Sequence, residues 1–145
     1  MQLASRDEQA GSAALELVVL APVLLLLISL VIAAGRTSIA YGSVQAAARE
    51  AARQASISRT PAAAALAAVS SADAELAQEN LNCSPAPLVT PKVAKGFAMP
   101  LGEPASVTII VSCTVSLSDL LLPGVPGSQT LTASFTSPLD PYRGR

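Results

Sequence analysis

Two cysteines, Cys83 and Cys113, are the residues best suited to covalent chemistry, and they are the only cysteines in the chain. An even number of cysteines in a small domain with few aromatic residues favours a disulfide. Such a bond would close a loop of about 30 residues and contribute roughly 3–4 kcal/mol in the chain-entropy account. The alternative is a pair of reduced thiols, with Cys113 packed as an ordinary apolar residue.

Other chemistries are excluded by composition. The 145 residues include no histidine, so neither a conventional zinc site nor a nucleophile paired with histidine is expected. Nine basic and ten acidic residues give a net charge of −1, and there is no tryptophan. Neither a basic stripe nor a stacking platform for nucleic acid is therefore expected. We expect no catalytic residue, metal or cofactor, and we do not expect an enzyme.

Glu16 immediately precedes an uncharged run of nineteen residues, Leu17 to Gly35. A run of about 18 or more apolar residues is typical of a transmembrane helix. Within it, Pro22 removes one backbone hydrogen bond and predicts a kink or a local loosening, which membrane helices tolerate.

The position of Glu16 has two interpretations. It can mark the helix boundary among lipid headgroups. Alternatively, a cut after Gly11 makes Ser12 the new N-terminus, with its α-amine about one helical turn from Glu16. In a low-dielectric environment each of these charges needs a partner, so the amine of one subunit could meet the carboxylate of its neighbour.

The string GSAALE at 11–16, followed by VLAPVLLL at 19–26, resembles the TadE-like family. These proteins are type IV pilin-like pseudopilins of the tight-adherence (Flp) pilus and secretion apparatus, and the likeness is greatest to the actinobacterial branch. The resemblance continues through AAAREAAR at 46–53 and more loosely at 117–124 and 137–144.

The resemblance implies a leader that prepilin peptidase removes between Gly11 and Ser12, with Glu16 and Pro22 serving subunit assembly. The implied partners are this peptidase, other pilin or pseudopilin subunits, and the assembly platform of the cytoplasmic membrane.

Helical spacing predicts one helix from Ala13 to Ile57, about 68 Å long, with Gly35 and Gly42 as its weak points. Its second half has an apolar stripe. The stripe comprises Ile39, Val44, Ala47, Ala48, Ala51, Ala52, Ala55 and Ile57.

A second helix is predicted over 62–81, with Thr60 as its N-cap and Pro61 at its first position. Helical spacing predicts that its buried face comprises Leu66, Val69, Ala72 or Asp73, and Leu76.

The rest of the chain predicts a small antiparallel sheet. Alternating patterns predict strands over Ser106–Leu117 and Gln129–Thr136, joined by a long connection over 119–128, and Leu88–Val93 is a third candidate. The tail Ser137–Arg145 is expected to be frayed.

The expected fold is therefore α+β: a long pilin-like helix, a second helix and a small C-terminal sheet with one disulfide. The expected division is a leader over 1–11, a transmembrane helix over 12–35, an amphipathic stem over 36–57 and an extracytoplasmic head over 58–145.

Two features of the sequence predict opposite orientations of the chain in the membrane. Arg36, Arg49 and Arg53 follow the apolar run and only Arg6 precedes it, which favours a cytoplasmic C-terminal part. The pilin resemblance implies the opposite, and a disulfide agrees with the pilin orientation. We therefore expect a single-pass protein of the cell membrane with a cytoplasmic N-terminus and an external head.

The function expected first is that of a minor pilin or pseudopilin that joins or primes a filament. One alternative is a secreted protein whose signal peptide has its apolar region over Val18–Gly35 and is cut after Gly35. Another is an uncleaved membrane anchor carrying a binding module.

Overall fold

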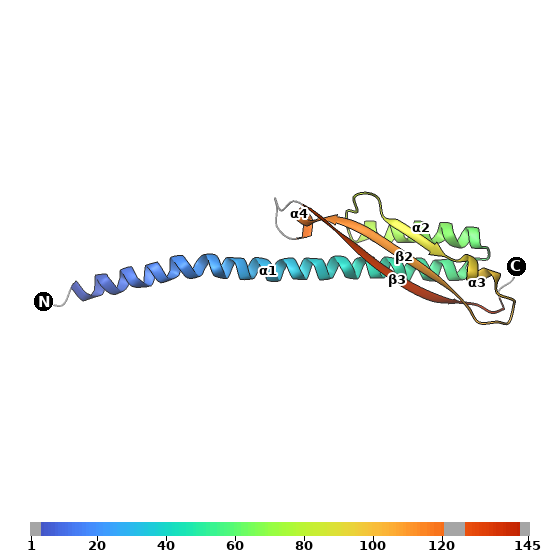
Figure 1. The fold of residues 1–145 in the computed structure, drawn as a ribbon, viewed down its shortest axis with the longest axis horizontal. Helices are drawn as coiled ribbons and strands as arrows, with labels where there is room; N and C mark the ends of the chain where they lie inside the picture. The colour runs from blue at the N-terminus through green and yellow to red at the C-terminus, as the bar shows by residue number, and fades with distance from the viewer. Residues whose placement is uncertain (1–3, 121–126, 143–145) are drawn as a thin grey trace.

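The computed structural model describes residues 4–120 and 127–142, with side chains described over 15–118 and 127–142. A long helix precedes a compact head of helices and strands (Figure 1). The elements are, in chain order, α1 (Ala4–Ile57), α2 (Pro61–Gln78), β1 (Leu88–Lys92), α3 (Ala94–Ala98), β2 (Ala105–Ser116), α4 (Leu117–Leu120) and β3 (Ser128–Leu139).

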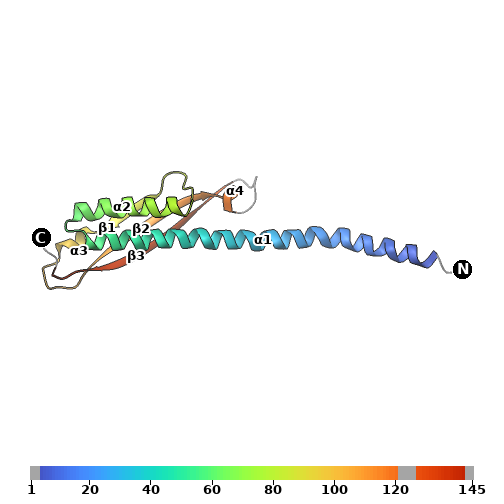
Figure 2. The ribbon, with the colours of Figure 1, turned by 180° about the vertical axis from the view of Figure 1, so that it is seen from behind.

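Helix α1 is continuous over 54 residues, and about half of it extends beyond the head (Figures 1 and 2). Its predicted end at Ile57 is confirmed, but the predicted start at Ala13 is wrong, because the residues before it are mostly good helix formers. The helix also passes Pro22, Gly35 and Gly42 without a break.

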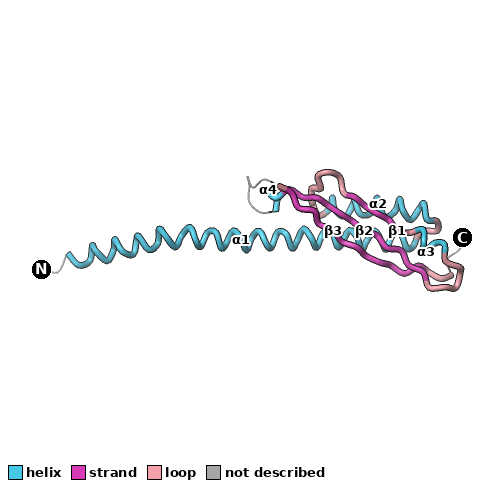
Figure 3. The backbone as a smooth tube through the Cα atoms, in the orientation of Figure 1, coloured by secondary structure: helices cyan, strands magenta, loops and turns pink. Residues whose placement is uncertain are grey.

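The three strands form one antiparallel sheet, as predicted, and the structure places them in the order β1-β2-β3 (Figure 3). Strand β3 pairs with β2 over its whole length, from Ser128 opposite Ser116 to Leu139 opposite Ala105. The frayed tail was therefore predicted three residues too early. Leu139 is buried in the core, and that burial favours continued pairing at the end of the strand.

The predicted connection over 119–128 is described only in part. The short helix α4 covers Leu117–Leu120, and residues 121–126 lie outside the described residues. The predicted strand end at Leu117 is thus one residue too late, since β2 ends at Ser116.

Helices α1 and α2 cover one face of the sheet and run antiparallel, with the end of α2 beside Ser43 in the second half of α1. The predicted inward residues of β2 are all buried: Val107, Ile109, Val111, Cys113 and Val115. In β3, Leu131 and Ala133 are buried as predicted, whereas Phe135 remains 38% exposed.

Helices α1 and α2 pack against each other, and most of their buried residues are alanine. The buried residues in the packed half of α1 include Ala47, Ala48, Ala51, Ala52 and Ala55, and those of α2 are Ala64, Ala68, Ala72 and Leu76. Small side chains allow the two helix axes to approach closely.

The buried alanines show that the predicted buried faces of α1 and α2 were partly wrong. Leu66 is 73% exposed and Val69 is 38% exposed, so only the Ala72 and Leu76 positions of the predicted α2 face were right. The α1 stripe is correct from Val44 to Ala55 but wrong at Ile39 and Ile57, which are exposed.

Candidate membrane and assembly segment

The free half of α1 is apolar on every side from Leu15 onward, and its side chains there remain largely exposed. The large apolar side chains from Leu15 to Ile32 are each between 48% and 72% exposed, and Ala33 is the first buried apolar residue. Monomeric soluble proteins rarely expose so large a continuous apolar surface. This half of the helix therefore requires lipid or other helices around it.

By length and composition, α1 from Leu15 to Ile57 is a candidate membrane span. Only 6% of its most apolar window is buried, which distinguishes it from the core helix of a soluble domain. A signal sequence near the N-terminus has the same composition. The apolar character therefore shows that the segment is directed to the membrane, and it does not show whether the segment is cleaved.

The predicted cleavage and assembly residues, Gly11, Ser12, Glu16 and Pro22, all lie on this free half. Gly11 and Ser12 lie within the continuous helix, and no helix break marks the expected cleavage position. Ser12 and Glu16 are four residues apart and thus share one helix face. Glu16 is exposed, and among the residues whose side chains are described its carboxylate has no hydrogen bond or ion pair.

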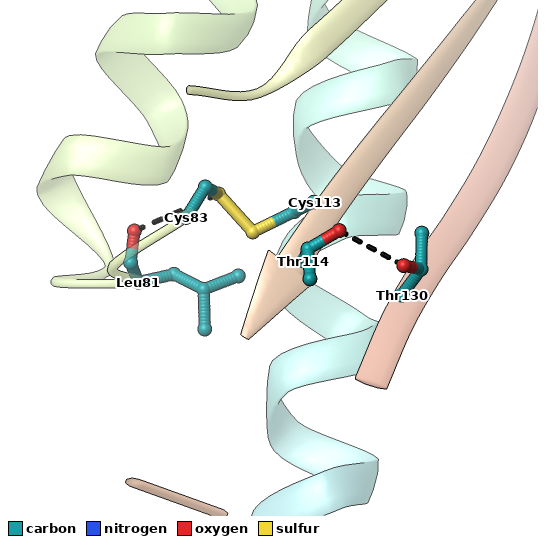
Figure 4. The surroundings of a disulfide bond; sticks show 5 residues. All are labelled: Leu81, Cys83, Cys113, Thr114 and Thr130. Atoms are coloured by element: carbon teal, nitrogen blue, oxygen red, sulfur yellow. Dashed lines mark hydrogen bonds between the residues drawn. A yellow bond between two sulfur atoms is a disulfide. The ribbon is translucent and has the colours of Figure 1, made fainter. Parts of the chain in front are cut away.

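The predicted disulfide is present. Cys83 lies in the loop after α2 and Cys113 on the central strand β2, with their Cα atoms 5.2 Å apart (Figure 4). Cys113 is fully buried, whereas Cys83 packs at the margin of the core. The bond therefore connects the helical layer to the middle of the sheet, and the reduced-thiol alternative is wrong for this structure.

Two polar contacts between elements have no clear signal in the sequence. The buried Ser43 hydroxyl shares its one proton between the Ile39 carbonyl at 3.2 Å and the Glu79 carboxylate at 3.4 Å, which ties α1 to the end of α2. The Arg49 guanidinium lies 5.5 Å from the centroid of the Phe135 ring, a cation–π contact between α1 and β3. Both contacts help to fix the direction in which α1 leaves the head.

A family comparison covers both halves of α1. Residues 11–53 match the TadE-like protein family. The TadE-like segment begins at Gly11 and includes the free half of α1 from that residue onward and most of the packed half. TadE-like proteins are pilus-associated structural proteins of the tight-adherence system, and the family is not known for enzymes. Other pilin subunits are accordingly the partners that the family suggests.

The predicted resemblance to TadE-like proteins is thus confirmed over these residues, and the actinobacterial branch stays a prediction. Comparisons with curated proteins and with solved structures gave no match.

Proposed function

We propose that this chain is a minor pilin or pseudopilin that assembles into or primes a tight-adherence filament after prepilin peptidase cuts between Gly11 and Ser12. The observation that carries the proposal is the single helix α1, apolar and uncovered in one half and packed into the head in the other. Such a helix can pass from the membrane into a bundle of equivalent helices while the head stays folded. The start of the family match at Gly11 also supports the proposed cleavage position.

In the proposed mechanism, Glu16 sets the register between subunits. After cleavage, the amine of Ser12 and the carboxylate of Glu16 lie on one face of α1 and form charge pairs between neighbouring subunits. Pro22 contributes in a second way, because it leaves the Val18 carbonyl without its helical donor. That carbonyl is then free to accept a hydrogen bond from a neighbouring helix.

The proposed orientation places the N-terminus in the cytoplasm and the head outside the cytoplasmic membrane, where the filament is assembled by its platform. The disulfide supports this orientation, since such bonds persist in oxidising compartments.

The cleavage is tested by the intact mass and N-terminal sequence of the protein purified from host membranes without reductant. We expect a chain that begins at Ser12 and is two hydrogens lighter than the reduced form. A chain beginning at Arg36 would identify a conventional signal peptide and overturn the pilin proposal. An intact Met1 terminus would indicate an uncleaved anchor.

The orientation is tested separately through the lysines. Lys92 and Lys95 are the only lysines in the chain, and both are exposed in the head. A membrane-impermeant amine reagent should label them in intact cells as fully as in lysed membranes. Labelling in lysed membranes alone would place the head in the cytoplasm, as the distribution of arginines favours.

A further inference from the structure

A pocket of about 200 Å³ lies between α1 and the end of α2, at the level where the apolar run of α1 ends. It is lined by residues 79–82 of the α2 end and the following loop, by Val115 of β2, and by Arg36, Ile39, Ala40 and Ser43 of α1. The four α1 residues have helical spacing and share one helix face. Sites for drug-sized ligands measure roughly 300–1,000 Å³, so this smaller pocket suits a small polar group.

Arg36 lies at the membrane end of the pocket. It is the first charged residue after the uncharged run over 17–35, so in a membrane-spanning α1 it lies among the lipid headgroups. Among the residues whose side chains are described, none forms an ion pair or hydrogen bond with its exposed guanidinium. The planar fork of donors on arginine is well suited to phosphate oxygens.

Glu79 lies at the opposite end of the pocket, beside Ser43. Ser43 follows Arg36 by seven residues, or about 10 Å along α1. The Glu79 carboxylate accepts the Ser43 hydroxyl at 3.4 Å through Oε2, and within the described part of the chain it has no ion pair. Helix α2 has no basic residue in its last turn, and a helix C-terminus carries partial negative charge. This end of the pocket therefore attracts a cation.

The turn that carries Glu79 is fixed by backbone hydrogen bonds. The Asn80 N–H donates to the Ala77 carbonyl at 3.1 Å, and the Leu81 N–H donates to the Leu76 carbonyl at 3.0 Å. Asn80 has a φ of 53°, the left-handed conformation that ends a helix in this motif. The disulfide at Cys83 holds the same loop against β2 (Figure 4). Because the pocket wall is ordered before a ligand arrives, binding loses little conformational entropy.

The order of the two charges selects one class of phospholipid headgroup. In a phospholipid the phosphate is joined to glycerol on the membrane side, and the group esterified to it extends away from the membrane. Arg36 lies on the membrane side of the pocket and Glu79 about two helical turns further out. A headgroup with a phosphate and a terminal ammonium group therefore meets an opposite charge at each end. A purely anionic headgroup leaves Glu79 without a cation.

We propose that this pocket binds the headgroup of a phospholipid that carries a phosphate and a primary ammonium group, as phosphatidylethanolamine does. The Arg36 guanidinium donates to the phosphate oxygens, and the ammonium group donates to the Glu79 carboxylate. The bound lipid ties the head to the membrane surface at a fixed height.

This site requires only that α1 stays in the membrane. Cleavage after Gly11 leaves the pocket unchanged, and both leaflets of a membrane present headgroups to Arg36. The result of the lipid test is therefore separable from failure of the pilin proposal.

Native mass spectrometry of the full chain in neutral detergent micelles tests the proposal. The probes are dihexanoyl phosphatidylethanolamine, phosphatidylcholine and phosphatidylglycerol, which have the same acyl chains. We expect one phosphatidylethanolamine per chain, bound at least about tenfold more tightly than the other two lipids. Phosphatidylcholine has the same charges but no N–H donor, and phosphatidylglycerol has no cation.

Variants of the two charged residues separate their roles. Arg36→Gln should weaken phosphatidylethanolamine binding at least about tenfold, because it removes the phosphate ligand. Glu79→Gln should abolish the preference for phosphatidylethanolamine over phosphatidylcholine. The matched controls are Arg59→Gln and Glu103→Gln, which change exposed charges elsewhere in the head and should bind as the wild type does.

Thermal unfolding without added lipid provides a readout of structure alone. Arg36→Gln and Glu79→Gln should both keep the wild-type midpoint of the head, since the two side chains form no ion pair with each other. An equal fall of both midpoints would mean that Arg36 and Glu79 pair with each other, and it would overturn the proposal.

Three binding results would also overturn it. Equal affinity for phosphatidylethanolamine and phosphatidylcholine would show that the ammonium group is not recognised. Tighter binding of phosphatidylglycerol would identify a site for anionic lipids. Displacement of phosphatidylethanolamine by equimolar inorganic phosphate would identify a soluble phosphate as the ligand.

Discussion

The Cα atoms of Cys83 and Cys113 lie 5.2 Å apart, and their disulfide joins the loop after α2 to the centre of the sheet. The core around this bond is built mainly from alanine and β-branched residues and includes no aromatic side chain that is fully buried among the described residues. Alanine buries little apolar area per residue, so the covalent bond contributes a large share of the stability of the head.

Replacing both cysteines, Cys83→Ala with Cys113→Ala, should lower the free energy of unfolding of the head by about 2–5 kcal/mol, because the unfolded chain regains the freedom that the loop closure removed. Guanidinium chloride denaturation, followed by circular dichroism, measures the change. Reductant should destabilise the wild-type chain and leave the double variant unaffected. An unchanged midpoint in both comparisons would contradict a structural role for the bond.

Ala68→Leu should destabilise the head by roughly 1–3 kcal/mol, because Ala68 is fully buried and α1 leaves no room for a larger side chain. Ala74→Leu is the matched control, since Ala74 lies exposed on the same helix. Its effect should stay within about 0.5 kcal/mol. Equal effects of the two substitutions on the thermal midpoint would mean that the alanine contact is not tightly packed.

Gly96→Ala should destabilise the head, because the new Cβ would collide with the Ser106 carbonyl oxygen on the neighbouring strand. The expected loss is about 1–3 kcal/mol, as for other insertions into packed sites. Gly42→Ala should have the opposite sign, since nothing lies within 4 Å of its Cβ position and alanine favours the helix by about 0.5–1 kcal/mol. The midpoints of thermal unfolding of the two variants should therefore lie on opposite sides of the wild-type midpoint.

Glu16→Gln should leave the stability of the head unchanged, because Glu16 lies on the free half of α1. Incorporation into filaments should fall at least about tenfold, since removing one partner of a buried ion pair costs roughly 3–5 kcal/mol. The ratio of chain in sheared filaments to chain in membranes measures this effect. Glu103→Gln, at an exposed position of the head, is the control and should assemble normally.

Local patterns in the sequence were sufficient for the two long helices, the three strands and the covalent link, but not for the short helices α3 and α4. The alternation from Val107 to Val115 predicted a strand and its buried face correctly, because a residue's neighbours two positions away always share its side of a strand. The cap at Thr60 was also correct, and its hydroxyl accepts the Ala63 N–H at 3.2 Å. The uncharged run after Glu16 predicted the apolar half of α1 by length alone.

Which helix faces are buried and which strand edge is left open depended on contacts between residues that are distant in the chain. Leu66 and Val69 are more apolar than Ala64 and Ala68, and an argument from hydrophobicity buries the larger pair. The packing of α1 on α2 reverses that choice, because Ala64 and Ala68 are fully buried while Leu66 and Val69 remain exposed.

The open edge of β3 likewise could not be predicted from the sequence pattern. Its alternating hydroxyl residues are visible in the sequence, but which of their peptide groups are satisfied follows from the strand order β1-β2-β3. Strand order is set by contacts between distant residues, which the pattern within one strand does not encode. Hydrophobic spacing therefore established what each segment of this chain becomes, whereas packing distance and strand order established which surfaces it leaves open.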